Sequence, residues 1–384
     1  MSPAATTLAA PQAPATQEPK QAPMPMVPFT RAAKEHIEPF DDRSTLLTAG
    51  ATLVGPIDVP AYGYMRAIVV KVDATGGAGG AAVVAAFEDA PWNVFQQIVL
   101  KDVNGAPIVG PISGYDLYLI NKYGGYKNPQ DPKTYPSFSA VASGAGASGN
   151  FAFLLRIPVE INSRDALGAL ANENASSTYK IEYTINTSGA VYTTAPATTL
   201  PTIRVRLSLE AWSQPPATDL RGNPQATAPP AHGTLGYYSK TVPALVNGQQ
   251  TIRLPRVGNY IRNIIFVIRD NTPTRAAGDG NWPDPIQIYW DTRLLHNLSK
   301  DIFKQYMSER GYLTAAIETA GGLDRGVFVY DWMHEFGQEY GQELRDGWLP
   351  TVQSTRLEAQ GVFGGAGSLS IITHDVAPVG QVFL

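Results

Sequence analysis

Apolar residues along this chain occur mostly as short runs or in alternation with polar residues. The alternation is clearest over 203–209, where Ile203, Val205 and Leu207 are separated by Arg204 and Arg206. Because successive side chains of a strand point to opposite faces, this period of two predicts a strand with one buried face. Further strand patterns in the first half of the chain cover 67–72, 94–100, 108–109, 151–157 and 179–185.

The second half of the chain repeats this style of short strands and tight turns. Its strand patterns cover 251–254, 261–268, 286–290, 327–332 and 369–373. Asn104-Gly105 and Asn247-Gly248 predict tight turns, because Asn-Gly readily adopts the positive φ angles that such turns need. The first of these turns separates two strand patterns and therefore predicts a β-hairpin.

Each half also contains one segment with helical periodicity. The first runs from Ser113 to Gly125 and the second from Ser299 to Gly311, a spacing of twelve residues in both. A serine before the first turn and a glycine after the last are typical helix ends. The apolar stripes of these two helices are formed by Leu117, Ile120 and Tyr123 and by Ile302, Phe303, Tyr306 and Met307.

A third helical pattern lies near the N-terminus. Phe29, Ala33 and Ile37 recur at four-residue spacing, and Pro39 follows them. This pattern predicts a short amphipathic helix within 29–40 that ends at the proline. Such a helix either docks on its own domain or contacts a partner chain or a membrane surface.

The two halves of the chain also resemble each other in sequence. I-D-V-P-A-Y-G-Y-M-R-A-I-V-V begins at Ile57, and I-R-L-P-R-V-G-N-Y-I-R-N-I-I begins at Ile252. The first matches lie at an offset of 195 residues (252 minus 57) and the next at 196 (262 minus 66). Later matches keep their order while the offset falls to 176 (358 minus 182). The matched pairs include Pro60–Pro255, Gly63–Gly258, Arg66–Arg262, Pro91–Pro283, Ser113–Ser299, Arg164–Arg345 and Glu182–Glu358. A repeat of this length predicts two copies of a whole domain with shorter loops in the second copy.

These patterns together predict an all-β fold. Short strands, many turns and one short helix per half indicate two tandem eight-stranded antiparallel jelly rolls. The predicted division is an N-terminal arm over 1–44, disordered over 1–28 and then helical, and a first jelly roll over 45–212. A linker over 213–232, with five prolines and no strand pattern, precedes a second jelly roll with a C-terminal tail over 233–384.

The composition of the chain excludes several classes of function. The formal net charge is −4 and charged residues make up 16% of the chain, which leaves no basic surface of the kind that binds nucleic acid directly. The absence of cysteine excludes disulfides, thiolate metal sites and thiol catalysis. No apolar run is long enough for a membrane span, and the N-terminus lacks the pattern of a secretory signal.

The richest polar cluster follows the predicted strand 327–332. Three glutamates would stack along one face of a helix at a spacing of four, and a histidine beside carboxylates is a candidate metal ligand. The cluster consists of Asp331, His334, Glu335, Glu339 and Glu343. However, the spacing is not that of a zinc-protease motif, and Gly337 and Gly341 disfavour a helix. A solvated polar loop or a polar patch between subunits is the favoured interpretation.

Two other kinds of site were considered. Paired carboxylates with a tryptophan platform would indicate a domain that binds or hydrolyses polysaccharide, although Trp290 lies in an alternating strand and is expected in the core. The tryptophans concerned are Trp282, Trp290, Trp332 and Trp348. The five histidines are dispersed and are expected to be surface or structural residues: His36, His232, His296, His334 and His374. No nucleophile elbow or phosphate-binding loop occurs, so no catalytic, metal or cofactor residue is predicted.

A family resemblance adds to these predictions. The stretch E-D-A-P-W-N-V-F-Q-Q-I-V-L-K-D-V-N-G-A-P-I from Glu88, then S-G-Y-D-L-Y-L-I-N-K-Y from Ser113, resembles the first barrel of tectivirus major capsid proteins. The run R-I-P-V-E-I from Arg156 fits the same picture. Tectiviruses are icosahedral phages with an internal membrane, and the resemblance covers roughly 45–380.

This resemblance implies a structural rather than an enzymatic role. Three copies would form a homotrimer of pseudo-hexagonal outline, and such trimers would tile an icosahedral shell in the virion after assembly in the host cytoplasm. Neighbouring trimers, penton proteins and minor capsid proteins would be the partners. The arm would lie at the base near the internal membrane, and the loops 74–90, 186–202 and 270–285 would be candidates for the outer surface. The alternative is an extracellular two-domain β-sandwich that binds or hydrolyses polysaccharide.

Overall fold

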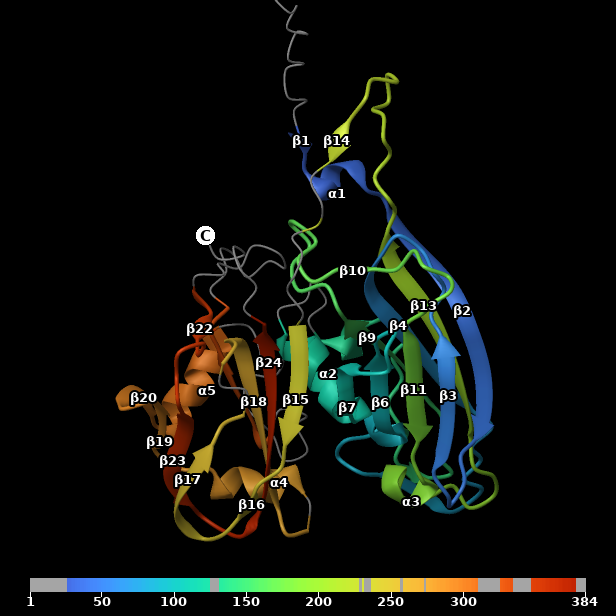
Figure 1. Ribbon diagram of the computed structural model, residues 1–384. Helices are drawn as coiled ribbons and strands as arrows, with labels where there is room; N and C mark the ends of the chain where they lie inside the picture. The colour runs from blue at the N-terminus through green and yellow to red at the C-terminus, as the bar shows by residue number, and fades with distance from the viewer. Residues whose placement is uncertain are drawn as a thin grey trace, which may run out of the picture.

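The computed structural model shows two β-barrels that stand side by side, each with one helix (Figure 1). It describes residues 26–124, 131–227, 230, 236–255, 258–272, 274–309, 325–333 and 347–377. The first barrel is drawn in blue and green, and the second in gold and red. A separate extension of the chain projects beyond the first barrel at one end.

The first barrel consists of two facing antiparallel sheets of four strands. The strands of one sheet are, in spatial order, β9 (Phe151–Pro158), β4 (Tyr64–Thr75), β13 (Thr202–Trp212) and β2 (Glu35–Leu46). The strands of the other sheet are β3 (Thr52–Asp58), β11 (Lys180–Ile185), β6 (Phe95–Lys101) and β7 (Pro107–Ile112). The predicted hairpin between β6 and β7 is confirmed, with Gly105 at a φ of 88° in its turn.

The second barrel has the same strand order. One sheet contains β21 (Val327–Asp331), β18 (Tyr260–Asp270), β24 (Gly367–Val376) and β15 (Gly236–Thr241). The other contains β17 (Gly248–Arg253), β23 (Leu357–Phe363), β19 (Ile286–Trp290) and β20 (Arg293–Leu298). Each strand therefore has a counterpart in the first barrel, beginning with β4 and β18, which carry the matched Arg66 and Arg262. The prediction of two tandem eight-stranded jelly rolls is confirmed.

Shorter elements complete the described chain. The helices are α1 (Phe29–Ala32), α2 (Gly114–Tyr123), α3 (Ser188–Val191), α4 (Arg275–Gly278) and α5 (Lys300–Glu309), with 3-10 turns η1 (Trp92–Val94), η2 (Pro132–Thr134) and η3 (Asp279–Asn281). The short strands are β1 (Met26–Val27), β5 (Val83–Ala86), β8 (Gly144–Ala145), β10 (Leu170–Ala171), β12 (Tyr192–Thr194), β14 (Ala226–Thr227), β16 (Ala244–Leu245) and β22 (Leu349–Pro350).

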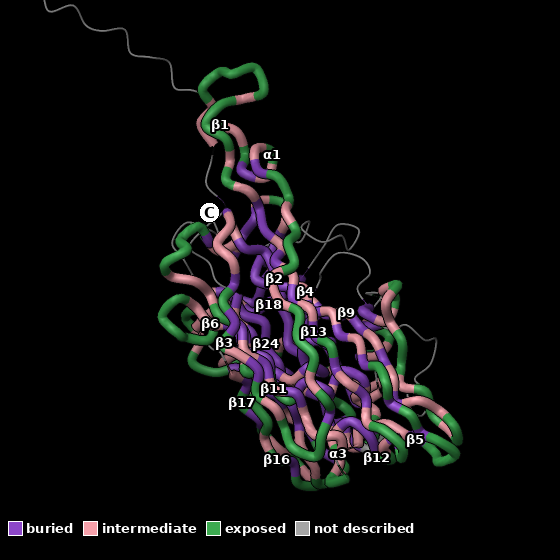
Figure 2. The backbone as a smooth tube through the Cα atoms, turned by 90° about the vertical axis from the view of Figure 1, so that its right-hand side faces the viewer, coloured by how far each residue is buried: buried purple, intermediate pink, exposed green. Residues whose placement is uncertain are grey.

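The two barrels share one continuous sheet. Tyr238 of β15 pairs in parallel with Val109 of β7, and this contact joins strands of both barrels into a ten-stranded sheet. Each barrel also has an aromatic pair in its core: Trp92 stacks on Tyr118 at 3.8 Å, and Trp282 stacks on Phe328 at 3.9 Å. Figure 2 shows buried residues along the middle of the barrels and exposed residues at both ends.

Residues that match in the sequence repeat have similar backbone surroundings in the two barrels. Gly63 and Gly258 precede β4 and β18 and have φ angles of 43° and 110°, which L-residues with a side chain rarely adopt. At Gly63 a Cβ would lie 2.0 Å from the carbonyl oxygen of Trp212, so no other residue fits. The Arg66 carbonyl accepts from Val159 at 2.9 Å, and the Arg262 carbonyl accepts from Trp332 at 2.9 Å. These matches show that the sequence repeat is also a structural one.

The helix predicted within 29–40 is wrong in its extent. Helix α1 covers only Phe29–Ala32, and residues 35–46 form β2, which pairs with β13 along its length. Phe29 and Ala33 are buried, but Ile37 is 66% exposed, so the four-residue stripe stops before it. Backbone pairing with β13 therefore determines the conformation of these residues, rather than the local helical pattern. Pro39 fits within β2 because β2 is an edge strand and has a bulge at that point.

The linker and the arm differ from prediction as well. The sequence predicts no strand over 213–232, whereas β14 of this segment pairs in parallel with β1 of the arm. Residues 1–25 of the predicted disordered arm lie outside the described residues. Strand β1 pairs with β14 in the extension, and Phe29 is buried against Tyr64 and Trp212 of the first barrel. Residues 35–44, which the sequence assigns to the arm, form part of the first sheet. The division points at 44, 212 and 232 stay predictions.

The two predicted helices lie at the predicted places. Helix α2 follows Ser113, whose hydroxyl accepts from the Asp116 amide at 3.1 Å while the Asp116 carboxylate accepts from the Ser113 amide at 3.1 Å. This reciprocal capping box stabilises the first turn. Helix α5 follows Ser299, although it is Asp284 that accepts from the Lys300 amide at 3.1 Å. Gly311, its predicted end, lies outside the described residues.

Replacing Ser113 by alanine removes the hydroxyl of the capping box. We expect Ser113→Ala to lower the free energy of unfolding by about 1 kcal/mol, because the Asp116 amide in the first turn of α2 loses its side-chain acceptor. Urea unfolding followed by tyrosine and tryptophan fluorescence measures the change. Thr187→Ala is the control, because Thr187 precedes the short α3 and makes no side-chain capping bond there. Equal shifts for both variants would contradict the capping role.

Candidate functional site

The polar cluster that the sequence singled out is only partly described. Asp331 is buried at the end of β21, and the other four members (His334, Glu335, Glu339 and Glu343) lie outside the described residues. Among the residues that are described, no group of three or more histidines and carboxylates is placed to hold a metal ion.

The tryptophans do not form an exposed platform. Trp282, Trp332 and Trp348 are all buried, and Trp290 is half-buried, with its indole nitrogen donating to the Ser354 hydroxyl. A sugar-binding platform needs exposed aromatic faces, so these residues do not supply one. Their positions agree instead with packing of the second barrel.

Three of the five histidines are described, and all three make aromatic contacts. His296 meets the ring of Tyr330 edge to face at 4.6 Å. His36 stacks on Tyr62 at 4.0 Å, whereas His374 is buried and stacks on Tyr238 at 4.2 Å. The Nδ1 atom of His374 lies 2.7 Å from a guanidinium nitrogen of Arg262. Burial and the positive charge of Arg262 lower the pKa of His374 well below 6.5. His232 and His334 lie outside the described residues.

The two duplicated arginines have different partners in the two barrels. Arg66 donates to Glu160 at 2.7 Å and to Glu35 at 2.8 Å, and its guanidinium lies 4.2 Å from the ring centre of Trp212. Burial works against the charge of Arg66, yet Glu160 and Glu35 raise its pKa above the ordinary value. Arg262 faces Trp348 at 5.6 Å and His374 instead. Each barrel thus keeps a buried guanidinium over an indole ring.

The richest cluster of charges lies where the barrels meet. Arg275 of α4, in the second barrel, is 1% exposed and donates through Nε to Asp89 of the first barrel at 2.8 Å. Arg269 of β18 donates to the other oxygen of Asp89 at 2.6 Å. Glu88 accepts from the Arg275 amide at 2.8 Å, and its carbonyl accepts from the Arg275 guanidinium at 3.1 Å. We call these four residues (Glu88, Asp89, Arg269 and Arg275) the junction cluster.

An aromatic ring completes the surroundings of these charges. The ring of Tyr115 in α2 lies 4.9 Å from the Arg275 guanidinium and 5.5 Å from that of Arg269. Burial opposes the charge on Arg275, but Tyr115, Asp89 and Glu88 together raise its pKa above the ordinary value. Arg275 therefore stays charged at the junction, and its buried charge requires the carboxylates of the other barrel.

A second set of contacts joins α2 to the second barrel. Lys240 of β15 donates to the Asp116 carboxylate at 2.6 Å, and this carboxylate also belongs to the capping box of α2. The Asn263 side-chain amide donates to the Tyr123 carbonyl, at the last residue of α2, at 3.0 Å. Both ends of α2 are thus fixed to the second barrel, so the helix links the two barrels.

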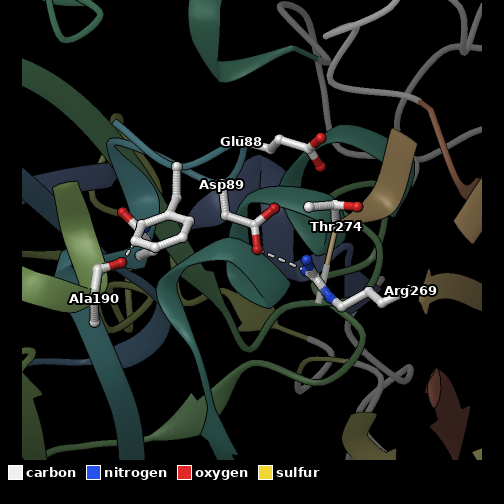
Figure 3. Close-up of a pocket in the computed structure, with 7 residues that line it drawn as sticks. Glu88, Asp89, Ala190, Arg269 and Thr274 are labelled. Carbon is white, nitrogen blue, oxygen red and sulfur yellow. Dashed lines mark hydrogen bonds and ion pairs between the residues drawn. The ribbon is translucent and has the colours of Figure 1, made fainter. Parts of the chain in front are cut away.

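A pocket of about 330 Å³ lies beside the junction cluster. Figure 3 shows the Asp89 and Arg269 side chains pointing toward each other across it, with Glu88 and Thr274 nearby. Asp89 and Arg269 are engaged in an ion pair between the barrels. The geometry of this site supports rigid attachment of one barrel to the other.

Sequence reasoning missed the junction cluster. Glu88 and Asp89 lie in the stretch that carries the family resemblance, but nothing in that stretch says that they face another barrel. One signal was present: Arg269 comes directly after the apolar run 264–268, where a charge marks the approaching end of a buried strand. Its partner was not predictable, because it lies 180 residues away in sequence.

The two ends of the molecule differ in what they carry. At one end β1, β14 and α1 form the projecting extension, and α3 and α4 lie at the opposite end (Figure 1). The predicted surface loops 186–202 and 270–285 contain α3 and α4, so these loops lie away from the arm. Among the described residues, no helix has the length and apolar character needed to cross a bilayer.

Removing Asp89 tests the junction cluster. We expect Asp89→Asn to lower the free energy of unfolding by about 3 kcal/mol, because the charge of Arg275 stays buried without its carboxylate. Urea unfolding measures this change, and limited proteolysis would show easier cleavage between the barrels. Asp42→Asn removes an exposed ion pair with Arg204 and should have little effect. Equal effects of the two variants would contradict a role of burial at the junction.

The stability of the protein should depend on pH through His374. The folded state holds His374 neutral, whereas the unfolded chain binds a proton near pH 6.5. The contribution is therefore complete above pH 6.5 and decreases as the pH falls, by at most about 1.4 kcal/mol per pH unit. Urea unfolding at pH 7.5 and pH 5 measures this slope. His374→Gln should flatten it, and an unchanged slope in that variant would show that other groups cause the dependence.

No family model and no curated protein matches the sequence. Similar solved structures exist, however. The STIV major capsid protein, from Sulfolobus Turreted Icosahedral Virus, has 14% sequence identity and a TM-score of 0.58, covering 90% of this chain and 97% of that chain. The PBCV-1 virus capsid structure has 12% identity and a TM-score of 0.58, covering 90% and 94%.

A bacteriophage structure is similar as well. The major capsid protein of bacteriophage PM2 has 12% identity and a TM-score of 0.51, covering 91% of this chain and 99% of that chain. In all three comparisons at least 90% of this chain is covered, so the likeness extends over both barrels. The chain therefore has the double jelly-roll fold of these viral major capsid proteins.

Proposed function

We propose that this chain is the major capsid subunit of a virus, and that it works by self-association rather than catalysis. The observation that carries the proposal is the pair of barrels with identical strand order, held side by side by buried charges. Three such subunits supply six similar barrels, so a threefold trimer has a pseudo-hexagonal outline. Objects of this outline tile the flat facets of an icosahedral shell.

The junction cluster explains why the pair of barrels behaves as one building block. A hinge between the barrels would let the outline of a trimer vary, and neighbouring trimers would then not tile. The charges of Arg275 and Asp89 and the cross-barrel contacts of α2 oppose such a hinge. The structural likeness to capsid proteins supports this interpretation at the level of the fold.

The finer parts of the proposal follow from the sequence resemblance to the tectivirus group. The subunit would form a shell around an internal membrane and be assembled in the host cytoplasm. Its partners would be other copies of itself, penton proteins and minor capsid proteins, with no direct contact to nucleic acid. The extension with β1 and β14 would lie at the base near the membrane, and the loops around α3 and α4 would face outward.

The alternative of a polysaccharide-binding or polysaccharide-hydrolysing protein is less well supported. It depended on an exposed tryptophan platform and on the carboxylates after strand 327–332. Three of the four tryptophans are buried, and most of those carboxylates lie outside the described residues. No described feature favours this function over assembly.

Mass measurement in solution tests the proposed function. We expect light scattering coupled to gel filtration to give a stable species near three times 41.2 kDa. Electron microscopy of concentrated samples should show particles or flat hexagonal arrays. A protein that stays monomeric at all concentrations and binds glycans would contradict the capsid function.

A further inference from the structure

Two strands form the contact between the barrels, and each lies at one edge of its own barrel. Tyr238 of β15 pairs in parallel with Val109 of β7, and their exposed fractions are 5% and 0%. The opposite edges of the two barrels are formed by β2 and β20, which end their sheets among the described strands. Figure 1 shows β2 and β20 at opposite flanks of the molecule. By strand order β2 corresponds to β15, and β20 corresponds to β7.

The pairing of the strands identifies the residue of β2 that corresponds to Tyr238. Counting starts from Arg66 and Arg262, which match in the sequence repeat and which the strand pairing skips in both barrels. From the next residue of each strand, successive partners lead to Ile37 in the first barrel and to Tyr238 in the second. The two paths are Ala67, Glu210 and Ile37, and Asn263, His374 and Tyr238. Ile37 of β2 therefore takes the place of Tyr238 of β15.

The pairing in the facing sheets identifies the residue of β20 that corresponds to Val109. Counting starts from Ile57 and Ile252, which begin the two matched sequences. The two paths are Ile57, Ile181, Leu100 and Val109, and Ile252, Ala359, Ile288 and His296. Both paths end beside a bulge, where the pairing skips Ile108 in β7 and Leu295 in β20. His296 of β20 therefore takes the place of Val109 of β7.

The residues at the two flanks are more exposed than their buried counterparts at the junction. Ile37 is 66% exposed, although Tyr238 is almost fully buried. His296 is half-buried, and Leu294 on the same strand is 43% exposed. Apolar side chains on an edge strand favour the addition of a further strand. Each flank of the subunit thus carries one half of a contact that the chain already forms once within itself.

The helices extend this correspondence and change its chemistry. Within the chain, Lys240 of β15 donates to Asp116 of α2 at 2.6 Å. The same count along β2 and along α5 places Pro39 where Lys240 lies and Ile302 where Asp116 lies. Ile302 is 58% exposed, and Pro39 is exposed as well. An apolar pair at the flanks therefore replaces the ion pair of the junction.

We propose that β20 and α5 of one copy pack against β2 of a second copy, as β7 and α2 pack against β15 within the chain. This inference rests on the proposed function and deepens it by naming the surfaces that join the subunits of a trimer. The occupant is a second copy because every copy carries β2, the counterpart of the strand that fills the equivalent place at the junction. A head-to-tail contact of this kind, made three times, closes a ring of six barrels.

Disulfide trapping tests the pairing of the strands, and the natural chain has no cysteine to interfere. In the double variant Ile37→Cys with His296→Cys, the two thiols meet only between copies, because β2 and β20 lie at opposite flanks of one molecule. Paired strands lie about 4.8 Å apart, a separation that a disulfide can span. We expect oxidation of the purified full-length protein to give bands at two and three times 41.2 kDa on a non-reducing gel, and none larger.

The same strand offers a matched control. Leu46 of β2 is 55% exposed but lies nine residues from Ile37 (46 minus 37), or about 30 Å along the strand. Leu46→Cys with His296→Cys should therefore give no such bands, and each single-cysteine variant should stay at the monomer position. Equal bands in the control would overturn the inference, because cross-linking would then reflect random collision. Bands from Ile37→Cys alone would overturn it too, because β2 would then face β2.

The apolar pair gives a second readout. Ile302→Asp should raise the protein concentration at which half of the trimer dissociates by about tenfold, because a carboxylate without a partner replaces an isoleucine in the contact. Adding Pro39→Lys should restore association, since the two new side chains repeat the pair of Lys240 and Asp116. The restored trimer should weaken with added salt more than the unsubstituted one. Val362 of β23 is also 58% exposed, and Val362→Asp should leave association unchanged.

These outcomes separate the inference from the proposed function. If the unsubstituted protein is trimeric by light scattering, the absence of a cross-link in the double variant would overturn the inference and leave the capsid function standing. A trimer that Ile302→Asp and Val362→Asp weaken equally would overturn it in the same way. An unsubstituted protein that forms no trimer would contradict the proposed function itself.

Discussion

The relative position of the two barrels depends on one buried ion pair. Arg275 is enclosed by the junction and stays charged, so its guanidinium needs the carboxylate of Asp89 from the other barrel. Any rotation that separates these groups would leave a charge away from both water and its partner. The interaction is therefore more important for fixing geometry than for its net contribution to stability, since desolvation offsets much of the attraction. Tyr115 and Arg269 extend the same constraint to α2 and β18.

The contacts around this pair connect local structure to assembly. Asp116 caps the helix α2 and also accepts from Lys240, so one carboxylate serves the start of a helix and the attachment of the neighbouring barrel. The parallel pair of Tyr238 and Val109 carries the sheet across the same boundary. A block with a defined outline results, and a defined outline is what the proposed tiling of trimers would require. The extension and the terminal loops lie outside this block, so they can differ without disturbing it.

Much of the fold could be predicted because it depends on local patterns. Alternation fixed strands such as β13, the Asn104-Gly105 pair located a hairpin, and the repeat indicated two copies. Predictions failed where distant partners decide the conformation. Residues 35–40 belong to the helical pattern predicted over 29–40, but they form the start of β2 because β13 offers a row of backbone partners. The junction cluster was not predictable for the same reason, since Asp89 and Arg275 are ordinary charged residues until the fold brings them together.

Arg66 and Arg262 occupy equivalent positions in the two barrels. Each guanidinium lies over an indole ring, but the other partners differ: a glutamate faces Arg66, and a histidine faces Arg262. The chain thus buries the same cation in two different surroundings. The indole ring is common to both, so stacking on an aromatic face is compatible with either kind of polar partner.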